Sequence, residues 1–108
     1  FKRDGYNIFS DVVITYPTAV LGGEVRVKTV DGEVVYEVKP GTASGTKVRL
    51  RGKGMPTLRN KAVRGDHYIT LIVDIPQRLN NDQKEALLAY NRALTGEEKH
   101  LKKKGFFK

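Results

Sequence analysis

The apolar residues of this chain change their period once, and this change limits the folds that the chain can adopt. Between residues 8 and 75, apolar and polar residues alternate in short runs, which is typical of strands with one buried face. Beyond Pro76 the spacing is that of an amphipathic helix, with Leu87, Tyr90 and Leu94 at positions i, i+3 and i+7. All of the predicted strands therefore precede this helix, which closes the domain.

Turn signals divide the alternating region into strands. The predicted strands cover residues 8–16, 24–29, 34–38, 46–51 and 67–75. A short helical turn is predicted over residues 17–21, because a proline begins it and two glycines follow it. Asp31-Gly32 separates the second strand from the third and is a strong hairpin signal. Residues 55–64 show no period and are predicted to form an exposed, mobile loop.

The helix carries its own start and stop signals. Asn80 is a candidate N-cap, and Gln83, three residues later, completes a capping box. Gly96 is a natural C-terminal stop. The helix is therefore expected to span about 14 residues, near the usual length in globular proteins. Residues 97–108 are basic and are expected to be either a frayed helix or disordered.

The apolar stripe of this helix is the strongest functional feature that the residues alone provide. It consists of Leu87, Tyr90 and Leu94, with Leu88 beside them. Either the stripe packs on the sheet of its own domain, or the helix projects and pairs with its twin in a second copy. A terminal helix that follows a complete sheet can exchange partners at low topological cost. The residues alone leave both alternatives open.

Length and composition fit one soluble globular domain. Of the 108 residues, 39% are hydrophobic and 30% are charged. No apolar run approaches the ~18 residues of a membrane-spanning helix. Cysteine is absent, which excludes disulfides and thiolate zinc sites and is compatible with a reducing cytoplasm. The opening residues, from Phe1 to Asp4, contain neither an initiating methionine nor a signal peptide, so we interpret the chain as a piece of a longer protein.

Residue patterns of enzymes are scarce. His67 and His100 lie in unrelated contexts, and His67 is interpreted as a structural or surface residue because nothing near it in sequence would orient it as a base. The sequence contains no histidine pair at i, i+4, no calcium-binding loop, no nucleophile elbow and no phosphate-binding P-loop. We therefore predict no enzymatic activity, no metal and no cofactor.

The formal charge of +8 makes nucleic acid a partner to consider. Four basic residues alternate along one predicted strand and the loop after it: Lys47, Arg49, Arg51 and Lys53. Such a row can follow a phosphate backbone, but a single-strand binder also needs exposed aromatic residues among its cations. None occurs between Tyr36 and Tyr68. The row is therefore interpreted as a solvated strand face, with a basic nucleic-acid-binding β-domain as the alternative.

Gly52-Lys53-Gly54 ends the same strand and has two interpretations. In the first, backbone N–H groups form an anion-binding nest, and Arg51 and Lys53 contact a phosphate or an acidic peptide tail. In the second, the glycines only provide positive φ angles where the strand bends away. The second interpretation is favoured, because glycines at the end of a strand more often serve the backbone turn than a bound anion.

Several short motifs occur in an order that resembles a known family. They are Phe1-Lys2-Arg3-Asp4-Gly5, Ala19-Val20-Leu21-Gly22-Gly23-Glu24, Thr29-Val30-Asp31-Gly32, Pro40-Gly41-Thr42, Ser44-Gly45-Thr46, Arg49-Leu50-Arg51-Gly52-Lys53-Gly54-Met55-Pro56, Gly65-Asp66, Pro76 and residues 79–84. No single motif is decisive. Their joint order and spacing, from Phe1 to about Leu94, resemble the second C-terminal β-domain of the DnaJ (J-domain) co-chaperones.

This resemblance implies a fold that is mainly β: a small β-sandwich of two sheets with one short helix, followed by a C-terminal amphipathic dimerisation helix. The implied boundaries are residues 1–76 for the sandwich, 77–96 for the helix and 97–108 for the basic tail. In the family, the C-terminal helix joins two protomers into a V-shaped clamp. The residues that match this helix in position are Leu87, Leu88, Tyr90 and Leu94.

The resemblance also implies partners. Phe1 matches an aromatic residue at a domain junction that helps form a hydrophobic peptide groove, of which it would be at best half. The implied partners are a second copy of the chain, unfolded polypeptides and, through the full-length parent, a DnaK-type ATPase chaperone. No membrane partner and a cytoplasmic location are implied. The residues that stimulate the ATPase lie in the J-domain, which this sequence does not include, and an alternative is that this domain only spaces and dimerises.

Overall fold

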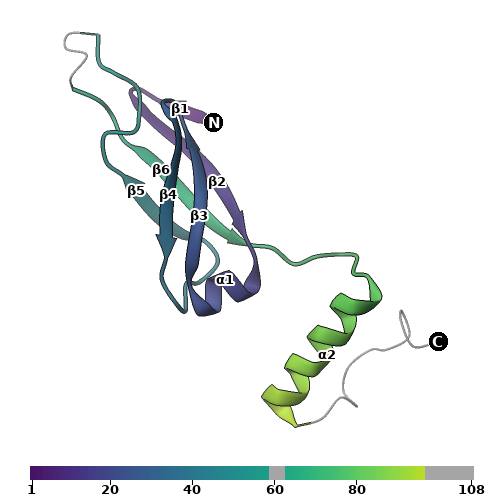
Figure 1. The fold of residues 1–108 in the computed structure, drawn as a ribbon. Coiled ribbons are helices and arrows are strands. Elements are labelled where there is room, and N and C mark those ends of the chain that lie inside the picture. Colours follow the sequence, from purple (N-terminus) through teal and green to yellow (C-terminus); the bar gives the residue numbers. More distant parts are fainter. Residues whose placement is uncertain (59–62, 97–108) are drawn as a thin grey trace. The chain divides into compact units, whose positions relative to one another are not determined.

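The computed structural model describes residues 1–58 and 63–96, and Figure 1 shows their fold. The elements in chain order are β1 (Lys2–Asp4), β2 (Asn7–Ile14), α1 (Tyr16–Leu21), β3 (Gly23–Thr29), β4 (Gly32–Val38), β5 (Thr46–Leu50), β6 (His67–Val73) and α2 (Asn81–Thr95). The chain divides into two compact units, one over Phe1–Ile75 and one from Pro76 onward, and each is described by itself. The expectations for residues 97–108, and part of that for the loop over 55–64, fall outside the described residues.

The strands of the first unit form two sheets. The larger sheet has the order β1-β2-β6-β5, and the smaller one is the β3–β4 hairpin (Figure 1). β1 with β2 and β5 with β6 are antiparallel, whereas β2 and β6 run parallel. This arrangement confirms the predicted mainly β fold of two sheets and a short helix. β1 was not predicted, because its three residues are too short for a period to show.

The core lies between the two sheets and follows the predicted alternation. Successive side chains of a strand point to opposite faces, so one face of each sheet is buried and the other stays open. The buried cluster comprises Ile14, Ala19, Val27, Val38, Ile69 and Leu71. Its members come from β2, β3, β4, β6 and α1, which means that the core joins both sheets and the short helix.

The β3–β4 hairpin occurs where it was predicted, but its turn lies one residue earlier than Asp31-Gly32. Thr29 pairs with Gly32, which leaves Val30 and Asp31 as the loop. The Thr29 hydroxyl donates to the carbonyl of Gly32 at 2.7 Å, and the N–H of Asp31 donates to the same hydroxyl at 3.2 Å. Gly32 has a φ of 115°, which other residues rarely adopt, so the glycine is required at the start of β4.

The second unit contains α2, whose ends agree with the predicted caps. The N–H of Gln83 donates to Oδ1 of Asn80, and the N–H of Asn80 donates to Oε1 of Gln83, both at 2.8 Å, so the capping box is complete. Gly96 ends the helix with a φ of 83°, and its N–H donates to the carbonyl of Arg92 at 2.6 Å. No helix in the described part of the chain is long and apolar enough to span a membrane.

Candidate functional site

The candidate site is built on β2, because one edge of this strand is only partly covered. β6 pairs with β2 from Ile8 to Ile14, whereas β1 pairs with it only from Asn7 to Phe9. From Ser10 to Ile14, the other edge of β2 therefore has no strand partner within residues 1–58 and 63–96. An edge of this kind presents free backbone N–H and C=O groups.

A groove of about 690 Å³ lies along this edge. Its apolar lining residues are Phe1, Phe9, Val12, Val13 and Val27. Three cations also line it, Lys2 from β1 and Arg26 and Lys28 from β3, against the single acid Asp11 from β2. The groove therefore combines apolar walls with an excess of positive charge.

Phe1 is the residue that the sequence singled out for peptide binding, and it lines this groove. This residue is 67% exposed. The ring meets the imidazole of His67 edge-on, with 5.1 Å between the ring centroids and an interplanar angle of 79°. The structure thus places Phe1 beside an open apolar surface, and its contact with a peptide stays a prediction.

His67 is fully buried beneath Phe1 and is a structural residue rather than an exposed base. Its Nε2 lies 2.7 Å from the hydroxyl of Ser10, and its Nδ1 has no hydrogen-bond partner in the described part of the chain. Burial lowers the pKa of His67, which favours the neutral imidazole. Across residues 1–58 and 63–96, no three His, Cys, Asp or Glu side chains gather as a metal site would need.

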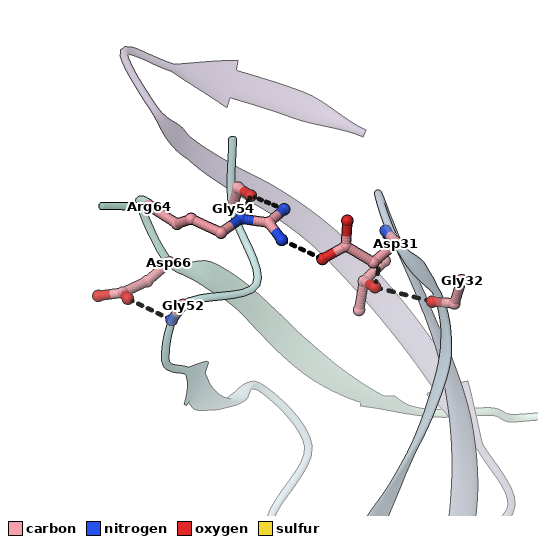
Figure 2. A network of polar contacts seen from close by, with 7 residues as sticks. Asp31, Gly32, Gly52, Gly54, Arg64 and Asp66 are labelled. Carbon is pink, nitrogen blue, oxygen red and sulfur yellow. Dashed lines mark hydrogen bonds and ion pairs between the residues drawn. The ribbon is translucent and has the colours of Figure 1, made fainter. Parts of the chain in front are cut away.

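Asp66 supplies an anion to the glycine-rich loop that follows β5. The N–H of Gly52 donates to Oδ1 of Asp66 at 2.9 Å (Figure 2), and Nε of Arg49 donates to Oδ2 at 2.6 Å. The bond from Gly52, followed by that from Arg49, holds the pKa of Asp66 below its usual value. The backbone N–H that was expected to face an external anion is therefore already bonded to a carboxylate of the chain itself.

The two side chains predicted to contact an anion, Arg51 and Lys53, lie on either side of Gly52. Arg51 is exposed and Lys53 is half-buried, and neither side chain forms a hydrogen bond or ion pair with another described residue. Gly52 has a φ of 69°, as the second interpretation of the loop requires, whereas Gly54 is not in the left-handed region. Binding of an external anion by Arg51 and Lys53 stays a prediction.

Gly54 and Gly65 lie where three backbone segments meet. The N–H of Gly54 donates to the carbonyl of Gly65 at 2.9 Å, and the N–H of Met55 donates to that of Tyr6 at 2.8 Å. A Cβ on Gly54 would lie 2.4 Å from the carbonyl oxygen of Tyr6, and one on Gly65 only 2.0 Å from it. These glycines permit a close approach of backbone to backbone, which neither interpretation of the loop had predicted.

Arg64 links the end of this loop to the β3–β4 hairpin (Figure 2). Its Nε and Nη2 donate to the carbonyl oxygen of Gly54 at 3.1 and 2.5 Å, and its Nη1 forms an ion pair with Asp31. Sequence analysis missed this link, because Arg64 and Asp31 are 33 positions apart. The only signal nearby was the Gly65-Asp66 motif, which carries no information about a partner in the hairpin.

The residues predicted for dimerisation are divided between two environments in α2. Leu87, Tyr90 and Leu94 are 53%, 43% and 65% exposed, whereas Leu88 is buried. Leu87, Tyr90 and Leu94 are thus partly exposed along the stripe at i, i+3 and i+7, and Leu88 lies on another side of the helix. Pairing of the exposed stripe with a second copy stays a prediction.

Comparison with known proteins assigns the first unit to a family. A family model described as the DnaJ C terminal domain matches residues 1–76. A Chaperone protein DnaJ of Lachnospira eligens is 78% identical over 99% of this chain, and those of Clostridium tetani and Clostridium acetobutylicum are 50% and 46% identical over 99% and 98% of it. The chain spans 28% of the length of each of these relatives. Because the family match includes every strand of both sheets, the chain belongs to the DnaJ C-terminal domain family.

Proposed function

We propose that this chain is the part of a DnaJ chaperone that holds unfolded polypeptide and joins two protomers. The observation that carries the proposal is the 78% identity with a Chaperone protein DnaJ over 99% of the chain, since this match includes both the groove and α2. The names of the relatives describe chaperones and do not point to the alternative of a nucleic-acid-binding domain.

The groove along β2 supports polypeptide binding. Exposed Phe1 and Val13 offer apolar contacts that demand no particular shape of the partner. The free edge of β2 offers backbone hydrogen bonds, which do not depend on the side chains of the bound segment. A site of this kind holds many different unfolded chains. It acts by binding and not by catalysis, and we place it in the cytoplasm.

The exposed stripe of α2 supports dimerisation. Leu87, Tyr90 and Leu94 form the surface that pairs with the same surface of a second copy, in a symmetric interface. Two weak grooves in one dimer raise the effective concentration of the second groove once a client is bound to the first. The full-length parent then delivers the client to a DnaK-type chaperone.

Both parts of the proposal are tested with the 108-residue chain and two variants, Leu87→Asp and Ala89→Asp. Ala89 is an exposed residue about 200° around the helix from Leu87, so Ala89→Asp introduces the same charge on another side. Sedimentation equilibrium should show a dimer for the unchanged chain and for Ala89→Asp, and a monomer for Leu87→Asp. The dimers should also bind fluorescein-labelled, reduced and carboxymethylated α-lactalbumin more tightly than the monomer.

Two outcomes would contradict the proposal. If the unchanged chain is monomeric at every concentration, or if both variants dissociate equally, the stripe is not the dimer interface. If none of the three proteins binds the unfolded α-lactalbumin, this part of the chaperone does not hold clients and only spaces or dimerises.

A further inference from the structure

The groove along β2 carries cations on both of its walls. Lys2 belongs to the larger sheet, and Arg26 and Lys28 belong to the smaller one. Nη1 of Arg26 lies 3.5 Å from Oε1 of Glu33, and this ion pair is exposed. Lys2 and Lys28 form no ion pair within the described part of the chain. A carboxylate that enters the groove would therefore meet an unpaired ammonium group on either wall.

The backbone of β2 faces the groove at alternate residues. The N–H of Ile8 donates to the carbonyl of Asp66, and the N–H of Asp74 donates to the carbonyl of Ile14, so the even-numbered residues of β2 direct their backbone groups toward β6. Asp11 and Val13 lie between them and direct theirs toward the uncovered edge. The groove therefore contains backbone donors and acceptors in the pattern that an added strand requires.

The aromatic residues at the Phe9 end of the groove are flanked by cations. Phe9 stacks on Tyr68 with 5.2 Å between the centroids and 12° between the planes, so the two inner ring faces cover each other. The strand register places Lys2 beyond Phe9 and Arg49 beyond Tyr68. A carboxylate is attracted by these flanking cations and by ring edges, which carry partial positive charge.

We propose that this groove selects extended polypeptide segments in which carboxylates lie next to apolar residues. The inference rests on the proposed client-binding function and adds a chemical preference to it. The apolar side chains of the segment pack against Phe1 and Val12, which lie on the same face of the larger sheet, and its carboxylates face Lys2 and Lys28.

The preference is tested by fluorescence anisotropy with three short peptides that have blocked ends and the same dye. In the first, glutamate alternates with leucine; in the second, lysine replaces the glutamate; in the third, serine replaces the leucine. The first peptide should bind the 108-residue chain at least about tenfold more tightly than the second, with an advantage that decreases as salt is added. The third should bind more weakly than the first, because it lacks apolar contacts.

Charge variants locate the effect in the groove. The double variant Lys2→Glu with Lys28→Glu should weaken binding of the glutamate–leucine peptide by about tenfold or more. Lys39→Glu makes one such substitution at an exposed lysine that does not line the groove and should leave the affinity within about twofold. Asp11→Asn, which removes the groove's own acid, should strengthen binding of this peptide.

Several results would overturn the inference. They are equal affinities for the glutamate and lysine peptides, an effect of the double variant no larger than that of Lys39→Glu, and tighter binding of an oligo-dT strand than of the glutamate–leucine peptide. If the two charged peptides bind equally while unfolded α-lactalbumin still binds, only the charge preference is wrong and the proposed function stands. If neither the peptides nor α-lactalbumin bind, the proposed client binding fails as well.

Discussion

The two units of this chain depend on contacts of different range. In α2, the first turn is closed by Asn80 and Gln83, which are three positions apart. In the sandwich, the β3–β4 hairpin is joined to the loop between β5 and β6 by an ion pair of Asp31 with Arg64, which are 33 positions apart. A change at a cap of α2 should therefore act on that helix alone. A change in the loop before β6 should act on the whole sandwich, because the loop contacts both sheets.

The largest effect is expected for Gly65→Ala. The new methyl group would lie 2.0 Å from the carbonyl oxygen and 2.4 Å from the carbonyl carbon of Tyr6, and backbone atoms cannot rotate away from it. We expect the free energy of unfolding of the sandwich to fall by about 3 kcal/mol or more. Urea unfolding followed by tyrosine fluorescence measures this loss.

The matched control for Gly65→Ala is Gly23→Ala. At Gly23 the nearest atom to a new Cβ is 3.7 Å away, and the backbone is not in the left-handed region. The free energy of unfolding should change by less than about 1 kcal/mol. Equal effects of the two substitutions would show that the close approach at Gly65 is not what holds the loop to β2.

A smaller loss is expected for Arg64→Met, which removes the link between the loop and the hairpin. The carbonyl oxygen of Gly54 loses the guanidinium donors, and Asp31 loses its ion-pair partner. We expect a loss of about 1–2 kcal/mol in the same unfolding experiment. Arg26→Met is the control, since Arg26 and Glu33 are 77% and 49% exposed, and its effect should stay below about 0.5 kcal/mol. If Arg64→Met lowers the free energy of unfolding no more than Arg26→Met does, the contacts of Arg64 stabilise the sandwich no more than an exposed ion pair does.

The smallest and most local effect is expected for Asn80→Ala. Loss of the side-chain acceptor should destabilise α2 by about 1 kcal/mol, because the N–H of Gln83 is left without its cap. Hydrogen exchange of the amides in the first turn should accelerate, while the urea midpoint of the sandwich stays unchanged. Asn81→Ala, one residue further along, removes the same side chain without removing the cap and should not accelerate exchange. A fall in the sandwich midpoint with Asn80→Ala would show that the two units are coupled.

The candidate site was predictable only in part. Phe1 was singled out through the family resemblance, and the structure places it on the groove. The groove itself was not predicted. It depends on how far β1 extends along β2 and on the position of β3 beside the uncovered edge of β2. Leu88 was predicted to take part in dimerisation together with Leu87, Tyr90 and Leu94; it is buried, and its part in dimerisation stays a prediction.

What the sequence by itself determined are the features that depend on neighbours a few positions away. These are the alternation that selects the core side chains, the place of the β3–β4 hairpin, and both ends of α2. Only the tertiary structure decided the parallel pairing of β2 with β6, the bond from Gly52 to Asp66, and the close approach of Gly65 to Tyr6. The physical reason is that local hydrogen bonds and side-chain periods are set by adjacent residues, whereas these pairings exist only when segments remote in sequence are packed together.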